Sequence, residues 1–169
     1  NTVGTESGED SWTLLSTPIT ETLAADAWTQ MAAADVPARV IEVGGADKGY
    51  YTVTKPVELK KNQKAVLTIT YKSGARRFDL DGADLLDQNS SVVASDYHHG
   101  YTGTAKENNT FSFIAPNDGN FNVRAFCDNR EGDIASTAEF KLEVYEAKEG
   151  VDVNADVVNI QGRWSRNTT

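Results

Sequence analysis

The sequence predicts an all-β protein: an antiparallel, jelly-roll-like β-sandwich with one short N-terminal helix. Apolar and polar residues alternate with period two from about residue 50 to residue 145, the pattern of strands with one buried and one solvated face. Clusters of glycine, proline, asparagine and serine separate these runs, as expected for short antiparallel strands joined by tight turns. We see no internal repeat and no βαβ alternation after residue 40, which disfavours propellers and doubly wound folds.

The N-terminal part predicts a helix over about residues 18–34. Thr17-Pro18 offers an N-cap followed by proline at the first helical position. Apolar residues then recur at every fourth position: Ile19, Leu23, Ala27 and Met31. Asp35-Val36-Pro37 is expected to end the helix, because the residue before a proline is biased away from the helical region.

The strands are predicted from alternation alone. The clearest runs are residues 65–71, 78–81, 110–113, 121–127 and 139–144, and a terminal strand through Trp12, Leu14 and Leu15 is compatible with the pattern. At 169 residues the chain suits one domain. We therefore expect a flexible lead-in at residues 1–11 and a single module over 12–169, with the sandwich core at about 48–146.

Charge and cysteine content narrow the function classes. The net charge of -9 repels a phosphate backbone, so nucleic acid is not expected as a partner. No apolar stretch is long enough for a transmembrane segment. Cys127 is the only cysteine and falls on a predicted buried face, so it should be inert. No nucleophile elbow or other catalytic signature is visible, and we expect this chain not to be an enzyme.

Two segments resemble known families. Phe111 to Arg124 is similar to a hairpin of galactose-binding-like jelly-roll modules, with aromatic residues on both arms of a Pro-x-x-Gly turn. Residues 77–103 resemble a strand, turn, strand and loop of accessory modules in secreted bacterial sialidases and related glycosidases. Together the likeness spans about residues 48–146.

The resemblance implies a non-catalytic carbohydrate-binding accessory module of a secreted glycosidase. Its expected partners are a glycan and neighbouring domains of the same chain. A structural or protein-interaction spacer of a multidomain surface protein is the alternative. The small, polar and acidic residues 1–11 have the composition of a segment that follows a removed signal or a lipoprotein anchor. We therefore expect a secreted or cell-surface bacterial protein, with a periplasmic or lipid-anchored location as variants.

The densest polar and aromatic cluster predicts the ligand site. It consists of Asp96, Tyr97, His98, His99 and Tyr101. These side chains offer stacking faces, hydrogen-bond donors and acceptors for a sugar, and the glycines at 100 and 103 let the loop bend around it. The alternative is that the tyrosine and histidine rings pack on the edge of the sandwich.

Further candidates lie outside that loop. Arg77, with its neighbour Arg76, can hold the carboxylate of a sialic acid, or simply pair with nearby aspartates. Trp164 stands in a polar tail and is a candidate stacking platform, whereas Trp28 is expected in the core. No cofactor is predicted. Calcium is the alternative use of four acidic residues that we otherwise expect on a solvated strand face: Asp79, Asp81, Asp84 and Asp87.

Overall fold

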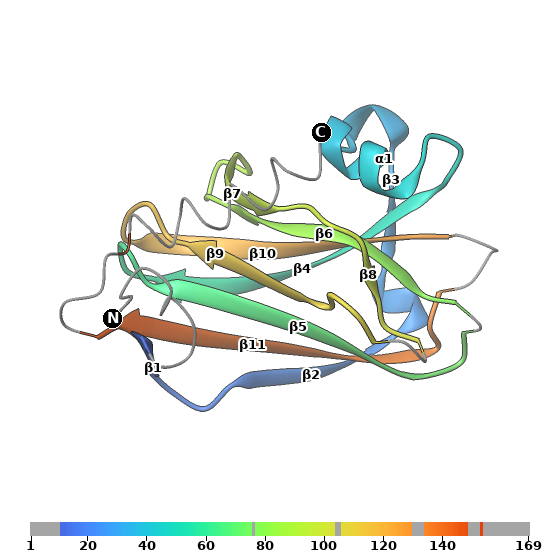
Figure 1. Cartoon of the computed structure of the whole chain (residues 1–169). Helices are drawn as coiled ribbons and strands as arrows, with labels where there is room; N and C mark the ends of the chain where they lie inside the picture. Colours follow the sequence, from blue (N-terminus) through green and yellow to red (C-terminus); the bar gives the residue numbers. More distant parts are fainter. Residues whose placement is uncertain (1–10, 76, 104–105, 130–133, 149–152, 154–169) are drawn as a thin grey trace, which may run out of the picture.

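The structure, a computed structural model, describes residues 11–75, 77–103, 106–129, 134–148 and 153. Two antiparallel β-sheets pack face to face, which confirms the predicted all-β sandwich (Figure 1). The first sheet consists of β1 (Trp12–Leu14), β2 (Ile19–Ala24), β5 (Lys64–Ser73), β9 (Thr110–Ile114) and β11 (Thr137–Ala147). Its order is β1-β11-β5-β9, and β2 pairs with β11 beyond the end of β1.

The second sheet consists of β3 (Thr29–Met31), β4 (Tyr50–Leu59), β6 (Asp79–Leu86), β7 (Val92–Asp96), β8 (Gly100–Tyr101) and β10 (Gly119–Asp128). Its order is β3-β4-β10-β6-β7, and β8 pairs with the start of β6. Consecutive strands often lie in different sheets, so the chain crosses the sandwich repeatedly. Among the described residues, no helix is long and apolar enough to cross a membrane.

The predicted hairpin at residues 111–124 is wrong. β9 pairs with β5 in the first sheet, whereas β10 pairs with β4 and β6 in the second. The turn at residues 116–118 therefore carries the chain from one sheet to the other. Aromatic residues on both arms still fill one core, since Phe111 and Phe121 both point into the space between the sheets. A turn signal and two aromatic arms do not distinguish a hairpin from such a crossing.

The main core lies between the sheets and follows the predicted alternation. Its members include Ala65, Leu67 and Ile69 from β5, and Phe121, Val123, Ala125 and Cys127 from β10. Cys127 is fully buried, and burial raises the pKa of its thiol, so it is not a reactive thiolate. Trp28 also belongs to this core, as predicted, with an edge-on contact to Phe78.

The predicted helix at residues 18–34 is also wrong. That region forms β2, β3 and the short 3-10 turns Ala25–Ala27 and Ala33–Asp35. A four-residue spacing is two strand periods as well as about one helical turn, so Ile19 and Leu23 share a face in either structure. Pairing of β2 with β11 decides in favour of the strand. The short helix of the fold is α1 (Ala38–Gly44), which begins directly after Pro37.

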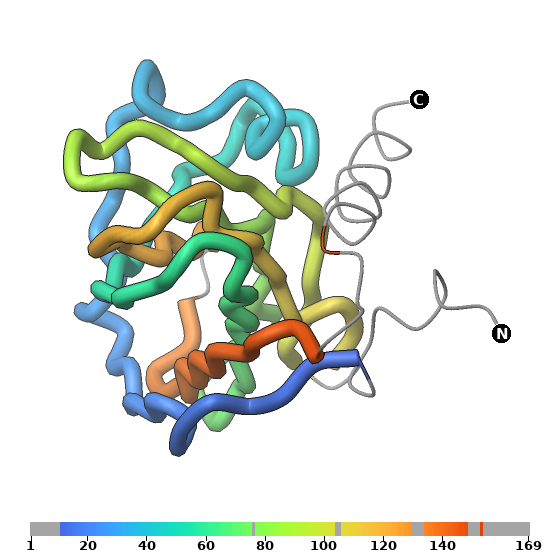
Figure 2. Tube along the Cα trace, turned by 90° about the vertical axis from the view of Figure 1, so that its left-hand side faces the viewer, coloured from blue at the N-terminus to red at the C-terminus, as the bar shows by residue number. Residues whose placement is uncertain are grey.

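Helix α1 covers the outer face of the second sheet, on the side away from the first sheet (Figures 1 and 2). A second, smaller apolar cluster lies beneath it. We call this the outer cluster, and its members are Val36, Val40, Tyr50, Tyr97 and Phe126, with Met31 and Ile41 packed against them. The close approach depends on Gly44, where an added Cβ would lie 2.6 Å from the Tyr50 hydroxyl and 2.7 Å from Asp81 Oδ1.

This cover buries β6 on both faces, so three aspartates expected on a solvated face are in fact inaccessible. Asp79, Asp81 and Asp84 are completely buried. Gly82, with a φ of 130°, lies at an irregularity in the β6 to β10 pairing. Asp87 instead accepts hydrogen bonds from backbone amides in the turn after β6. Within the described ranges, no group of three or more His, Cys, Asp or Glu side chains is arranged to hold a metal ion.

Candidate functional site

A polar cleft opens between α1 and the chain that follows β7. Arg39, Glu42 and Val43 line it from the helix, and His98, His99 and Asn108 line it from the opposite side. Its volume is about 370 Å³. The cleft therefore contains two of the residues that the sequence predicted for the site, facing helix residues that it did not.

His98 holds one wall of this cleft in place. Its Nδ1 lies 3.0 Å from Asp96 Oδ1, and its Nε2 lies 3.0 Å from the backbone oxygen of Asn108. Asp96 also accepts a hydrogen bond from the Ser112 amide, at 2.9 Å, which links the edge of the second sheet to β9 of the first. The His98 ring packs on Phe111, with 4.5 Å between ring centres. Asp96 and His98 are both buried, so they contribute to the cleft mainly by holding its wall in position.

Tyr97 is buried as well and cannot serve as a stacking platform in this structure. Its hydroxyl donates to Asp84 Oδ2. Arg124 grips the same carboxylate with two contacts, Nε to Oδ1 at 2.9 Å and a terminal nitrogen to Oδ2 at 2.7 Å. Burial and then the Asp84 charge raise the pKa of Tyr97 well above its ordinary value. The three side chains form one paired, hydrogen-bonded network.

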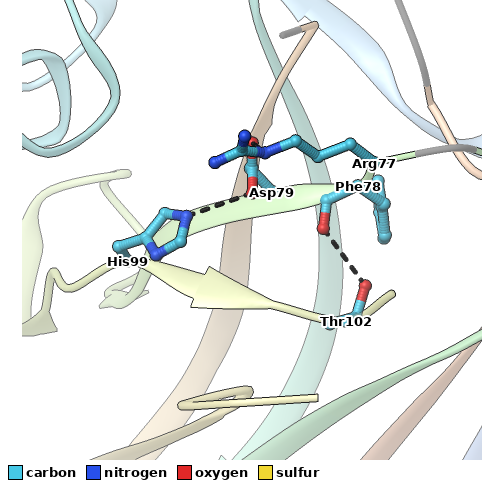
Figure 3. Close-up of polar contacts among 5 residues, drawn as sticks. All are labelled: Arg77, Phe78, Asp79, His99 and Thr102. Carbon is cyan, nitrogen blue, oxygen red and sulfur yellow. Dashed lines mark hydrogen bonds and ion pairs between the residues drawn. The ribbon is translucent and has the colours of Figure 1, made fainter. Parts of the chain in front are cut away.

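His99 is the exposed member of the predicted loop, with 43% of its side chain accessible. Its Nε2 lies 3.1 Å from Oδ1 of the buried Asp79, and Arg77 Nε donates to the other Asp79 oxygen at 3.0 Å. Figure 3 shows the His99 ring and the Arg77 side chain both turned towards Asp79. The Arg77 guanidinium also lies over the ring of the partly buried Tyr101, 5.8 Å from its centre.

The loop that follows β7 is held by hydrogen bonds at its C-terminal end. The backbone amide and the hydroxyl of Thr102 both donate to the carbonyl oxygen of Phe78, at 3.3 and 3.4 Å, and Figure 3 shows the hydroxyl contact. Gly100 lies against the chain rather than against open space, because an added Cβ would be 2.5 Å from the Asn108 oxygen. Glycine is therefore needed here for close backbone packing, not for the approach of a ligand as the sequence indicated.

The remaining predicted residues have different places. Arg77 and Tyr101 lie beside Asp79 and are not among the residues that line the cleft. Trp164 lies outside the described residues. Trp12, in β1, is buried, with Lys64 Nζ 4.3 Å from the centre of its ring.

Sequence reasoning missed the helix side of the cleft. Arg39 and Glu42 form an ion pair of 3.0 Å at the spacing of neighbours on one helix face. That spacing, between Pro37 and the pair Gly44-Gly45, was the available signal for a short helix. Because the helix was predicted further upstream, at residues 18–34, this signal was overlooked.

The lining of the cleft consists mainly of polar, hydrogen-bonding side chains. Its lining contains no serine, threonine, cysteine or lysine, so it offers none of these common nucleophiles. It does offer a carboxylate, an imidazole, a guanidinium and an amide, which together donate and accept hydrogen bonds. These groups belong to a helix and to a loop that is held by hydrogen bonds, so a ligand would bind to a largely preformed site.

A second hollow differs in character. It is a groove of about 450 Å³ at the open side of the sandwich, near Leu15, Ile19, Pro56, Val57 and Val144, with Ser16, Glu58, Gln63 and Asn120. Ile19 is 50% exposed and Leu15 is 45% exposed. The salt bridge between Lys55 and Glu21, 2.7 Å long, joins β4 of one sheet to β2 of the other on the same side. We call this hollow the edge groove.

No family model and no curated protein matches the chain. Solved structures with a similar arrangement include the Aeromonas hydrophila periplasmic inhibitor of g-type lysozyme, with 9% identity, a TM-score of 0.39, and coverage of 78% of this chain and 87% of that one. The xylan-binding module CBM86 from Roseburia intestinalis has 9% identity and a TM-score of 0.32, over 79% and 99% of the two chains. The CBM22-1 xylan-binding domain from Paenibacillus barcinonensis has 11% identity and a TM-score of 0.33, over 86% and 92%. These likenesses do not assign the chain to a family.

Proposed function

We propose that this protein is a non-catalytic carbohydrate-binding module and that the polar cleft is its binding site. The observation that carries the proposal is the convergence of Arg39, Glu42 and His99 on one hollow, from two different elements of the fold. Sugars carry hydroxyl groups that both donate and accept, and charged side chains make the stronger hydrogen bonds to them. The cleft supplies both kinds of partner within a volume of about 370 Å³.

The resemblance of residues 77–103 to accessory modules extends this proposal. We place the module beside the catalytic domain of a secreted glycosidase, in a secreted or cell-surface bacterial protein. There it would raise the local concentration of the enzyme at its glycan and would perform no chemistry itself. The full open reading frame tests this part directly, since a catalytic domain should be encoded next to the module.

Site variants test the binding site. The parent protein should bind a reproducible set of glycans on an array. Glu42→Gln or His99→Ala should weaken that binding about 10- to 100-fold, as expected for loss of one charged hydrogen bond. Glu58→Gln is the matched control, because Glu58 lines the edge groove instead. Equal affinities for all three variants would place the site elsewhere, and the absence of any glycan ligand would contradict the proposal.

The edge groove favours the second candidate function, a structural or protein-interaction module. Its exposed Leu15 and Ile19 suit contact with the apolar side chains of a protein partner. Under this alternative, Ile19→Asp should abolish association with the neighbouring domain, measured by titrating the two purified domains. The cleft variant His99→Ala should leave that association unchanged.

A further inference from the structure

The geometry of the cleft points to uncharged, hydroxyl-rich sugars as its ligands and to rejection of sugars that bear a carboxylate. This inference rests on the proposed function and specifies the ligand class. It runs against the sequence interpretation in which Arg77 holds the carboxylate of a sialic acid. Three features of the described residues carry it.

The first feature is the unequal exposure of the ion pair on α1. Glu42 presents 60% of its side chain to solvent, whereas Arg39 presents only 10%. The two side chains are 3.0 Å apart, so the recessed guanidinium is already neutralised by the carboxylate in front of it. An anionic ligand would meet the Glu42 charge first, and like charges brought together at a binding site are unfavourable.

The second feature is the orientation of His99. Its Nε2 faces Oδ1 of Asp79, and the oxygen of an ionised carboxylate can only accept a hydrogen bond. The proton of the neutral ring therefore belongs on Nε2, and Nδ1 is left as an acceptor. Together, Glu42 and His99 offer acceptors, which need hydroxyl hydrogens from the ligand. An ionised sugar carboxylate has none to donate.

The third feature is the engagement of Arg77. Its Nε donates to Asp79 Oδ2, and the Asp79 carboxylate is completely buried. Binding a ligand carboxylate through this guanidinium would weaken the pairing of a buried charge, which is strongly unfavourable. The Arg77 charge is thus already paired with a buried carboxylate of the protein.

The experiment compares matched sugars on the folded protein. Neutral cello-, xylo- and galacto-oligosaccharides are titrated beside uronic-acid or sialylated counterparts of the same length. The neutral member of a pair should bind at least about tenfold more tightly. Glu42→Gln keeps the shape and removes the negative charge, so it should reduce that preference by raising the relative affinity for the acidic member. Glu58→Gln, outside the cleft, should leave the ratio unchanged.

The possible results separate the inference from the proposed function. Tighter binding of acidic sugars, or of cationic amino sugars such as glucosamine oligomers, would overturn the inference and leave carbohydrate binding standing. An unchanged ratio in Glu42→Gln would also overturn it, because the discrimination would not come from this carboxylate. Failure of every sugar to bind would remove the proposed function and the inference with it.

Discussion

Strand β10 separates two cores of different chemistry. One face of β10 contributes Val123 and Ala125 to the core between the sheets. On the other face, Phe126 belongs to the outer cluster beneath α1, and Arg124 pairs with Asp84. The first core is a continuous apolar contact between two sheets. The outer cluster instead lies beside a buried ionic network of Arg124, Asp84 and Tyr97. Helix α1 lines one side of the cleft and packs on the outer cluster, so the position of that side depends on this second region.

The largest expected effect is in the core between the sheets. Phe113→Ala removes an almost fully buried ring and should lower the free energy of unfolding by about 3–5 kcal/mol. Phe113→Leu keeps more of the apolar volume and should lose less. Denaturant unfolding measures both. Because the cleft does not contact Phe113, the protein that remains folded should keep its glycan affinity, and a parallel loss of affinity would show that the two regions are not separable.

A comparable effect is expected in the buried network of Arg124, Asp84 and Tyr97, with a different signature. Arg124→Met leaves the buried Asp84 without its cation, and should cost up to about 3–5 kcal/mol. Replacing both partners, as in Arg124→Met with Asp84→Leu, should recover part of this loss, since no charge is then left unpaired. Unfolding of the single and double variants measures the coupling. Strictly additive losses would mean that the pair contributes only through packing.

The smallest expected effect comes from Tyr97 and depends on pH. Tyr97→Phe removes one hydroxyl and should lower stability by about 0.5–1.5 kcal/mol at neutral pH. Burial and Asp84 raise the pKa of Tyr97 in the folded state above its ordinary value of 10.0. The unfolded chain therefore ionises first, and the stabilisation is complete below pH 10.0 and declines as the pH rises above that value.

Tyr97→Phe should consequently show a shallower loss of stability above about pH 10 than the parent protein. Unfolding curves recorded at several alkaline pH values provide the measurement. Tyr71→Phe is a useful control, because the Tyr71 hydroxyl contacts the backbone of Ala75 rather than an acid. Identical slopes for the parent and Tyr97→Phe would mean that the Tyr97 hydroxyl is not protected.

The same division between the two cores explains what the sequence could predict. Alternation in β5 and β10 identified the faces between the sheets, because period two reports one buried face directly. The same alternation predicted that Asp79, Asp81 and Asp84 are exposed to solvent. This was wrong because a pattern within one strand carries no information about a helix that covers its other face. The position of α1 was missed because the spacing of Ile19 and Leu23 fits a strand as well as a helix.

Only one side of the candidate site was therefore predicted from the sequence. The loop at residues 96–101 was located from its polar and aromatic composition, and His98 and His99 do line the cleft. Arg39 and Glu42 were missed with their helix. Asp96 and Tyr97 were expected to meet a ligand, but their hydrogen bonds to Ser112 and Asp84 bury them, and such long-range partners cannot be read from local composition.

The position of β11 has a consequence for the order in which this protein folds. In the first sheet β11 joins β1 and β2 on one side to β5 on the other, and it is the last of the described strands in the chain. Until residues 137–147 are synthesised, β2 and β5 lack the strand that pairs them into one sheet. An emerging chain would expose both as unpaired edges, a state prone to association with other chains. Completion of this sheet should therefore be a late and slow step, governed by pairing between distant parts of the sequence.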